Sequence, residues 1–310
     1  MTRTDVACIL GPTASGKTGV AVALAHRLPV RVISMDSVQV YRGMDVGTAK
    51  PDPATRRAVP HHLVDIRDPA DPYSAAAFCR DARAEIDAAR AAGQWPLLVG
   101  GTMLYFRALA HGLAPLPEAD ARTRRAIESE AAARGWPALH AELREIDPAS
   151  AERIEPGDSQ RIQRALEVYR VSGLAMSALW QQTEEQGDLR FRSWVICPPT
   201  RSELHERIEQ RFRAMVADGL VDEVRALRAR GDLHPDLPAI RAVGYRQAWQ
   251  YLEGALDADG LLARGVIATR QLAKRQLTWL RRESGAEWLG PEGGDAAAAR
   301  LERALAGAGD

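Results

Sequence analysis

A glycine-rich loop between an apolar run and a helix-like segment constrains this chain more than any other feature. Gly11 is separated by four residues from Gly16-Lys17-Thr18, so the segment follows the pattern GxxxxGK[ST]. The apolar run Val6–Leu10 precedes the loop, and Val20–Ala25 has the composition of a helix. The order of strand, glycine loop and helix is the context in which this pattern binds phosphate groups.

The loop predicts a site for a polyphosphate. Successive backbone N–H groups of such a loop point inward, and the N-terminus of the following helix adds partial positive charge. Lys17 supplies a mobile cation, and the Thr18 hydroxyl can reach a Mg²⁺ ion. An ordinary glycine-rich turn is the alternative, and the pattern does not say which polyphosphate is bound.

The composition is that of an ordinary globular protein. The chain has 310 residues, of which 46% are hydrophobic and 26% are charged, and this length favours about two domains. No apolar run approaches the roughly 18 residues of a membrane span, and no secretory segment precedes the first strand. Cys8, Cys79 and Cys197 are far apart, which argues against a zinc site or a disulfide framework. We expect a cytoplasmic protein.

The first third of the chain alternates strands with helices. Val30–Met35, His62–Ile66 and Pro96–Val99 are expected to be further strands. A helix between the last two is expected to begin after Ser74 as its N-cap and to end before Gly93. This order predicts an α/β fold with a P-loop NTPase-like parallel sheet.

A helical insertion interrupts the α/β pattern. Residues 117–186 look helical and charged, with breaks at Gly135, Pro148, Pro156-Gly157 and Gly173. Ser193–Pro198 then restores a strand, which we expect to rejoin the sheet. The expected domains are a discontinuous core of residues 1–115 and 193–310 and a helical insertion of residues 116–192. The alternative is two sequential domains with a stray edge strand.

Two strand ends carry candidate catalytic residues. An ATPase or GTPase normally has an acidic residue after a later apolar strand, where it organises Mg²⁺ and water, but Pro96–Val99 is followed by Gly100-Gly101-Thr102. Asp36 follows the second strand, at the edge where open α/β sheets bind ligands. Asp36 can act as a base or hydrogen-bond acceptor for a nucleophile that attacks the phosphorylated compound. The alternative is that Asp36 caps the following turn.

The net charge of the whole chain is zero, but one segment near the C-terminus is strongly basic. The 41 Lys and Arg residues balance 41 Asp and Glu residues, which alone argues against a nucleic-acid partner. The charged residues between positions 268 and 282 are nevertheless all basic, namely Arg270, Lys274, Arg275, Arg281 and Arg282. On a helix, Lys274, Thr278 and Arg281 share one stripe, whereas Leu272, Leu277 and Leu280 suit the core. A solvated charged face is the alternative.

Seven sequence blocks follow one another along nearly the whole chain, namely Gly11–Thr18, Ser34–Pro51, Pro60–Ile66, Val99–Tyr105, Asp158–Val168, Val243–Gln247 and Lys274–Arg281. Together they resemble the bacterial tRNA dimethylallyltransferase family. The resemblance implies transfer of a dimethylallyl group from dimethylallyl diphosphate to the exocyclic N6 amine of the adenosine 3′ of the anticodon in tRNA, with release of pyrophosphate. The chain lacks the C-terminal zinc-finger spacing of eukaryotic members, so it resembles the shorter bacterial form.

The resemblance also implies the residues of the catalytic site. Asp36 would receive the amine proton or hydrogen-bond the amine, and Thr102 would lie beside the reaction centre, although a helix N-cap is an alternative role for Thr102. Thr18 would bind Mg²⁺, the expected cofactor. The diphosphate-binding residues would be Gly11, Thr13, Ala14, Ser15, Gly16, Lys17 and Thr18.

The tRNA contacts implied by the resemblance fall on four segments, and the helical insertion is expected to contact the anticodon stem. The target base must leave its stack to reach the diphosphate, so the protein has to hold the anticodon loop of the tRNA while the base enters the site. We expect a monomer without an obligate protein partner. The implied contacts are Asp36, Ser37, Val38 and Gln39; Gln160, Arg161, Ile162, Gln163 and Arg164; Arg241, Gly244, Tyr245 and Arg246; and Lys274, Arg275, Gln276, Thr278, Trp279 and Arg281.

Two rival functions use the same loop. In a P-loop small-molecule kinase, Asp36 would accept the proton of a substrate hydroxyl, but the basic segment would stay unexplained. In a non-catalytic RNA-binding protein, the loop would be vestigial, and tRNA affinity would not depend on Asp36.

Overall fold

The computed structural model describes residues 5–182, 189–290 and 293–307. The chain forms two compact units, one made of residues 1–110 and 188–310 and the other of residues 111–187. The divisions fall after residues 110 and 187, rather than after 115 and 192 as the sequence indicates. Part of the segment expected to be helical, residues 183–186, lies outside the described residues.

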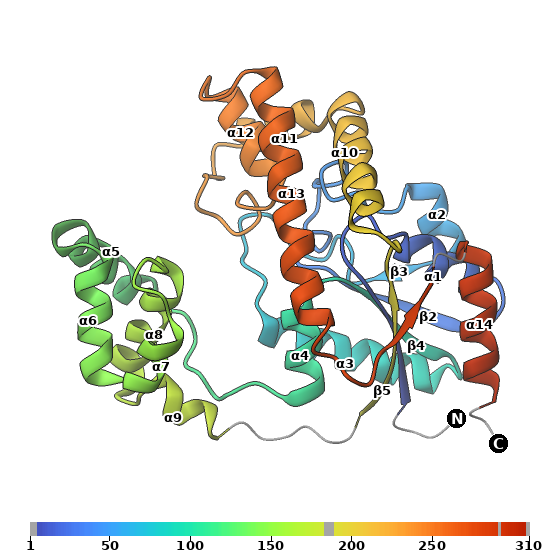
Figure 1. The fold of residues 1–310 in the computed structure, drawn as a ribbon, viewed down its shortest axis with the longest axis horizontal. Helices are drawn as coiled ribbons and strands as arrows, with labels where there is room; N and C mark the ends of the chain where they lie inside the picture. Colours follow the sequence, from blue (N-terminus) through green and yellow to red (C-terminus); the bar gives the residue numbers. More distant parts are fainter. Residues whose placement is uncertain (1–4, 183–188, 291–292, 308–310) are drawn as a thin grey trace. The chain divides into compact units, whose positions relative to one another are not determined.

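A six-stranded parallel sheet runs through the first unit (Figure 1). The strand order is β3-β2-β4-β1-β5-β6. β5 pairs with β1 along the length of β1, with Trp194 opposite Ile9, so the strand after the insertion rejoins the sheet as expected. The strands are β1 (Asp5–Leu10), β2 (Val30–Met35), β3 (His61–His62), β4 (Trp95–Gly100), β5 (Arg190–Ile196) and β6 (Glu287–Leu289).

The expected strand His62–Ile66 is wrong beyond its first residue, because only His61–His62 pairs with β2. Leu63 and Asp65 have φ angles of 62° and 59°, a left-handed conformation that interrupts an extended strand. The Asp65 carboxylate binds the side chains of Lys50 and Arg56. These ion pairs stabilise the turn in place of strand pairing.

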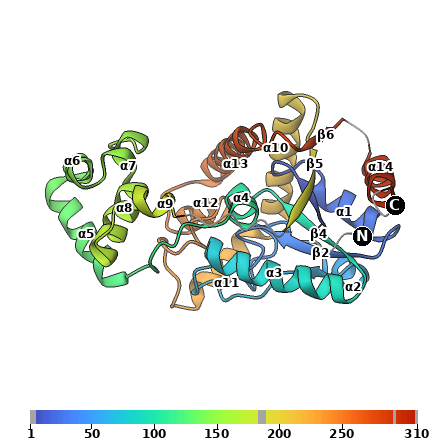
Figure 2. The ribbon, with the colours of Figure 1, turned by 90° about the horizontal axis from the view of Figure 1, so that it is seen from below.

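Helices cover both faces of the sheet (Figure 2). Ile9 packs in the cluster with α1 and α14, whereas Leu10 packs with residues of α3, α4, α11, α12 and α13, as alternation along a strand requires. The Ser74 hydroxyl accepts the backbone N–H of Ala77 and caps α3, as expected. The helices of this unit are α1 (Lys17–Ala25), α2 (Pro53–Ala58), α3 (Ala75–Ala91), α4 (Met103–His111), α10 (Arg201–Ala217), α11 (Leu220–Ala229), α12 (Tyr245–Leu252), α13 (Ala258–Leu280) and α14 (Gly294–Ala306).

The second unit is helical and has its own apolar core. Leu139, Leu143, Ile162 and Leu166 are fully buried in it. Helices end at the expected breaks, with Gly135 and Gly173 as C-caps. None of the described helices of either unit is long and apolar enough to cross a membrane. The helices are α5 (Ala121–Arg134), α6 (Trp136–Ile146), α7 (Pro148–Arg153), α8 (Ser159–Ser172) and α9 (Met176–Trp180).

Candidate active site

The glycine-rich loop connects β1 to α1, in the context that the pattern predicts. Gly16 is the N-cap of α1, which begins at Lys17. The Ser15 hydroxyl is buried and has no hydrogen-bond partner among the described residues. A buried hydroxyl without a partner is costly, so a ligand that accepts its hydrogen bond stabilises the loop.

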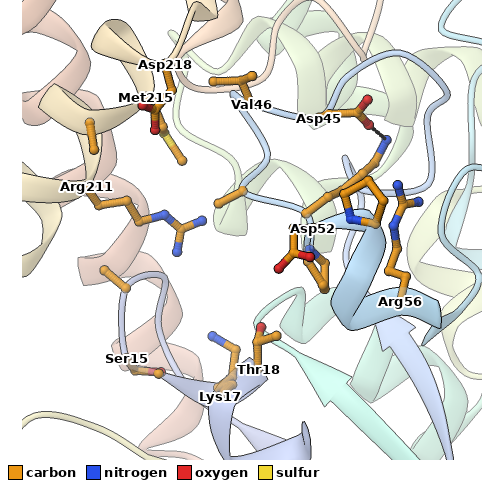
Figure 3. A pocket seen from close by; sticks show the side chains of 17 residues that line it. Ser15, Lys17, Thr18, Asp45, Val46, Asp52, Arg56, Arg211, Met215 and Asp218 are labelled. Carbon is orange, nitrogen blue, oxygen red and sulfur yellow. Dashed lines mark hydrogen bonds and ion pairs between the residues drawn. The ribbon is translucent and has the colours of Figure 1, made fainter. Parts of the chain in front are cut away.

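A cavity of about 630 Å³ lies over this loop (Figure 3). The described residues that line it come from three segments, namely residues 14–18, residues 45–56 and the C-terminal half of α10. Figure 3 shows the Lys17 amine and the Arg211 guanidinium pointing into the cavity from α1 and α10. Two cations therefore converge beside the glycine loop.

Lys17 and Arg211 both have a lowered pKa because of their surroundings. Burial, and to a lesser extent the nearby charge of Arg211, lower the pKa of Lys17 to about 8, while Asp36 acts in the opposite direction. Burial also lowers the pKa of Arg211, and the Asp36 charge again opposes this shift. Two positive groups held close together and partly desolvated favour the binding of an anion.

Asp36 performs the turn-capping role that the sequence left open. Its Oδ1 atom accepts hydrogen bonds from the backbone N–H groups of Val38 (2.8 Å) and Gln39 (3.2 Å). Its Oδ2 atom makes neither of these two bonds, so capping the turn leaves one oxygen for a second role. Asp36 is not among the described residues that line the cavity; its link to the cavity is the electrostatic effect on Lys17 and Arg211.

Thr102 follows the end of β4 and contacts the Asp36 turn. Its Oγ1 atom accepts the backbone N–H of Ser37 at 3.2 Å, so Asp36 and Thr102 are held at neighbouring strand ends. Glycine at position 101 lets the Gly11 carbonyl and the Gln276 side chain lie close to this turn. A Cβ atom there would lie 2.8 Å from the Gly11 carbonyl oxygen and 2.5 Å from the Gln276 side chain. Three distant segments therefore meet at the Gly101 turn.

Gln276 on α13 ties the glycine loop to that turn. Its Oε1 atom accepts the backbone N–H of Thr13 at 2.8 Å, and its Nε2 atom donates to the Gly101 carbonyl at 3.0 Å. Both ends of the side-chain amide are occupied by backbone groups. The sequence block suggests Gln276 as a tRNA contact, whereas the structure shows it joining two loops of the site.

The residues present fit a divalent cation held together with a phosphate ligand. The described residues contain no group of three or more His, Cys, Asp or Glu side chains that could hold a metal ion by themselves. Thr18, whose hydroxyl is a hard oxygen ligand, and Asp52 both line the cavity. Mg²⁺ is typically bound by one or two carboxylates plus substrate phosphates and waters, and the cavity supplies that kind of incomplete ligand set.

Most of the expected tRNA contacts on α13 and just beyond its end are exposed. Lys274, Arg275, Thr278 and Arg281 have exposed side chains, whereas Trp279 is partly covered by the guanidinium of Arg107, 5.3 Å from the ring centre. Arg241 and Arg246 are also exposed and line a second cavity of about 380 Å³.

Three of the expected tRNA contacts are buried, and the expectation is corrected for them. Ile162 and Tyr245 are both 0% exposed, so neither side chain is accessible to RNA in this structure. Ile162 packs in the core of the second unit, and the Tyr245 hydroxyl donates to Glu223. Gly244 is buried as well, as the N-cap of α12.

On α8, two of the residues expected to contact RNA form hydrogen bonds within the protein. Arg164 binds the buried Glu167 carboxylate at 2.7 Å and donates to the Pro117 carbonyl. Gln163 donates to Glu128. Gln160 and Arg161 have exposed side chains, so they are the members of this segment on the surface.

Arg211 is a candidate site residue that sequence reasoning missed. It lies on α10 among other arginines, and no motif marks it. The available signal is its position between Ile208 and Phe212, which are buried, because a cation at the edge of an apolar stripe is partly desolvated.

The fold and the cavity define a P-loop protein whose cavity has two cations, Lys17 and Arg211, among its lining residues, with a carboxylate nearby and no acidic residue at the end of β4. The family model described as IPP transferase matches residues 39–283, and the model described as isopentenyl transferase matches residues 4–65. The chain belongs to the IPP transferase family. This assignment favours a prenyl transferase over a small-molecule kinase.

Relatives match along nearly the whole chain. A tRNA dimethylallyltransferase of Alkalilimnicola ehrlichii is 58% identical over 92% of this chain and 90% of its own length. One of Halorhodospira halophila is 58% identical over 89% of each chain. The solved tRNA isopentenylpyrophosphate transferase of Bacillus halodurans is 36% identical, covers 98% of this chain and 96% of its own, and superposes with a TM-score of 0.71. A eukaryotic dimethylallyltransferase, 23% identical with a TM-score of 0.77 over 93% of this chain and 74% of its own, shares the fold.

Proposed function

We propose that this protein transfers a dimethylallyl group from dimethylallyl diphosphate to the N6 amine of the adenosine 3′ of the anticodon in tRNA. The observation that carries the proposal is the convergence of Lys17, Arg211 and the glycine loop on one cavity, near a carboxylate and without an acidic residue after β4. Such a site favours a diphosphate, and it has no residue at β4 that would activate water. Together with membership of the IPP transferase family, this supports displacement of a diphosphate by a nucleophile other than water.

The cations and the loop act on the leaving group. As the bond between the allylic carbon and the diphosphate oxygen breaks, the electron pair goes to that oxygen and negative charge grows on the diphosphate. The Lys17 ammonium, the Arg211 guanidinium and the loop N–H groups face this charge and stabilise it more in the transition state than in the ground state. The Ser15 hydroxyl, which has no partner among the described residues, donates to the same group.

Magnesium is the cation that we propose for the site, with the Thr18 hydroxyl as its protein ligand. When bound, Mg²⁺ neutralises charge on the diphosphate oxygens. Lys17 and Arg211 hold the diphosphate in the same cavity, and the dimethylallyl group reaches the nucleophile from there.

Asp36 and Thr102 act on the nucleophile. An adenine amine is a weak nucleophile because its lone pair is delocalised into the ring, and it loses a proton as the new C–N bond forms. The Asp36 Oδ2 atom accepts that proton, while Oδ1 stays bound to the Val38 and Gln39 amides and fixes the carboxylate. Thr102, held against the same turn, positions the reacting groups.

The exposed basic residues of α13 and of the segments around the start of α12 are the surface that we propose for tRNA. Lys274, Arg275 and Arg281 contact phosphates, and Arg241 and Arg246 extend the surface. Gln160 and Arg161, on the helical unit, are further contacts in this proposal. The cytoplasm is the proposed compartment, since tRNA is the acceptor.

A mass measurement on RNA tests the function. Purified protein is incubated with Mg²⁺, an unmodified anticodon stem-loop with an A-A-A run 3′ of the anticodon, and either dimethylallyl diphosphate or ATP. We expect the RNA to gain one C₅H₈ unit with dimethylallyl diphosphate and to gain nothing with ATP. Absence of any gain with any tRNA, together with ATP turnover on a small hydroxyl compound, would overturn the proposal.

A further inference from the structure

The Glu223 carboxylate on α11 is bound to a loop that lies far away in the sequence. It accepts the backbone N–H groups of three consecutive residues, Asp45 (2.7 Å), Val46 (2.8 Å) and Gly47 (3.1 Å). The hydroxyl of Tyr245 donates a fourth hydrogen bond to it at 2.5 Å. Charge-assisted bonds of this kind are among the strongest in proteins, so one side chain fixes the conformation of the loop.

The loop is also packed tightly against the same helices. A Cβ atom at position 47 would lie 2.6 Å from the Tyr245 ring and 2.7 Å from a methyl group of Leu220. Only glycine allows this approach, because a larger residue would push the loop away from α11 and α12. Packing and hydrogen bonding therefore hold the loop from the same side.

The other side of the loop faces the proposed diphosphate site. Asp45, Val46 and Ala49 line the cavity. The Thr48 carbonyl accepts hydrogen bonds from Arg211 (3.4 Å) and from the Gln39 side chain (3.3 Å). Displacement of the loop thus moves a wall of the cavity and removes a carbonyl that orients the Arg211 guanidinium.

We infer that Glu223 is a positioning residue for the diphosphate substrate, which it serves by fixing residues 45–47 so that the loop orients Arg211 and closes one wall of the cavity. This inference rests on the proposed function. Glu223 is not among the described residues that line the cavity, and it acts through the backbone of the loop and through Thr48. Tyr245, placed among the tRNA contacts by its sequence block, belongs to this support instead.

Steady-state kinetics of Glu223→Gln test the inference. The amide keeps the size of the side chain but loses the charge, and its NH₂ group faces backbone N–H groups that need an acceptor. We expect KM for dimethylallyl diphosphate to rise about tenfold, with the affinity for tRNA changed by less than about threefold. Glu223→Asp, which keeps the charge on a shorter side chain, should restore part of the loss.

Two further variants keep the test decisive. Tyr245→Phe removes one hydrogen bond to Glu223 and should raise KM for dimethylallyl diphosphate by a smaller factor. If Glu223→Gln does not fold, the KM of Tyr245→Phe tests the inference in its place. Asp222→Asn, an exposed neighbour on α11 paired with Arg225, should leave KM unchanged. An unchanged KM in both Glu223→Gln and Tyr245→Phe, or a lower melting temperature with unchanged KM, would overturn the inference.

Binding of inorganic pyrophosphate separates this inference from the proposed function. Calorimetry measures that binding without any transfer reaction. If the wild-type protein transfers nothing to RNA, the proposed function fails, but weaker pyrophosphate binding by Glu223→Gln would still support the positioning role. Equal pyrophosphate affinity in the wild type and the variant would contradict it.

Discussion

The backbone N–H of Thr13 donates a hydrogen bond to the Gln276 side chain across a sequence separation of 263 residues. Because Gln276 also donates to the Gly101 carbonyl, its side chain holds both the glycine loop and the turn that carries Thr102. Gln276 lies on α13, the helix whose exposed face carries Lys274 and Thr278 and whose C-cap is Arg281. The proposed RNA surface and the support of the proposed diphosphate site therefore belong to one helix.

We predict that Gln276→Ala weakens use of the diphosphate substrate more than binding of tRNA. The substitution removes two hydrogen bonds, each of which contributes about 1 kcal/mol, so the glycine loop and the Gly101 turn lose their connection. kcat/KM for dimethylallyl diphosphate should fall by about tenfold or more. Steady-state kinetics at saturating tRNA measure this fall, and filter binding measures tRNA affinity.

Gln271→Ala is the matched control for that prediction, because Gln271 is an exposed residue of the same helix. It should change neither quantity. If Gln276→Ala instead weakens tRNA binding as much as it lowers kcat/KM, Gln276 contacts RNA directly, as its sequence block suggests, and the support role is wrong.

The charge of Lys17 predicts an alkaline limb in the pH profile. Burial and the nearby Arg211 lower the pKa of Lys17 to about 8, while Asp36 and Cys197 act in the opposite direction. Raising the pH through about 8 removes the positive charge from the free enzyme, so kcat/KM for dimethylallyl diphosphate should fall as the pH rises and level off below that value. Lys17→Met should be far less active and should lack this limb.

Arg211→Gln gives a directional check on the same prediction. Since the Arg211 charge lowers the pKa of Lys17, its removal should move the alkaline limb to higher pH while lowering kcat/KM at every pH. Arg213→Gln, an exposed arginine of the same helix paired with Glu209, should leave the limb in place. If the alkaline limb of Arg211→Gln lies at the same pH as in the wild type, a group other than Lys17 causes the fall in kcat/KM.

Much of the fold can be predicted from sequence because its signals are local. β1, β2 and β4 are largely apolar runs, as strands buried on both faces require, and the Ser74 cap marks the start of α3. Asp36 stands out because it directly follows such a strand. The extent of the third strand is not predictable in this way, because Asp65 turns the chain through ion pairs with Lys50 and Arg56, which no local pattern reveals.

The residues that hold the site in place cannot be predicted from sequence, because each acts through contacts with residues that only the fold brings together. Arg211 and Glu223 lie on charged helices whose sequences resemble ordinary solvent-exposed segments. Glu223 meets its partner Asp45 across 178 residues. Tyr245 lies in a block that the resemblance assigns to tRNA contacts, but it is completely buried, with Gly47 of the distant loop packed against its ring.

Replacement of Asp36 by asparagine separates its two roles. Asp36→Asn keeps a side-chain oxygen that can accept the Val38 and Gln39 amides, so the turn should remain intact. The new amide group cannot take the proton of the adenine amine, and the transfer rate should fall by about 100-fold or more. The affinity for tRNA should stay within about threefold, as measured by filter binding.

Asp259→Asn provides the control for Asp36, because Asp259 is an exposed carboxylate in the first turn of α13. Its transfer rate should equal that of the wild type. Transfer by Asp36→Asn at the wild-type rate would remove Asp36 from the base role and leave it as a cap. Loss of tRNA binding in that variant would instead assign it to RNA recognition.

Arg281 predicts a salt-dependent contribution to tRNA binding. Its side chain is exposed at the C-terminal end of α13, on the same stripe as Lys274 and Thr278. A phosphate contact releases counterions, so Arg281→Ala should weaken tRNA binding and reduce the slope of log K against log salt by about 0.7 to 0.9. KM for dimethylallyl diphosphate should stay the same, because Arg281 is not among the described residues that line the cavity.

Arg264→Ala serves as the comparison, since Arg264 is exposed near the opposite end of the same helix. Equal salt slopes for Arg281→Ala, Arg264→Ala and the wild type would show that the C-terminal end of α13 is an ordinary solvated face. A reduced slope in Arg281→Ala alone would place the phosphate contact there. Because Gln276 connects that helix to the glycine loop, such a result would also mean that tRNA binds on the element that holds the diphosphate site in shape.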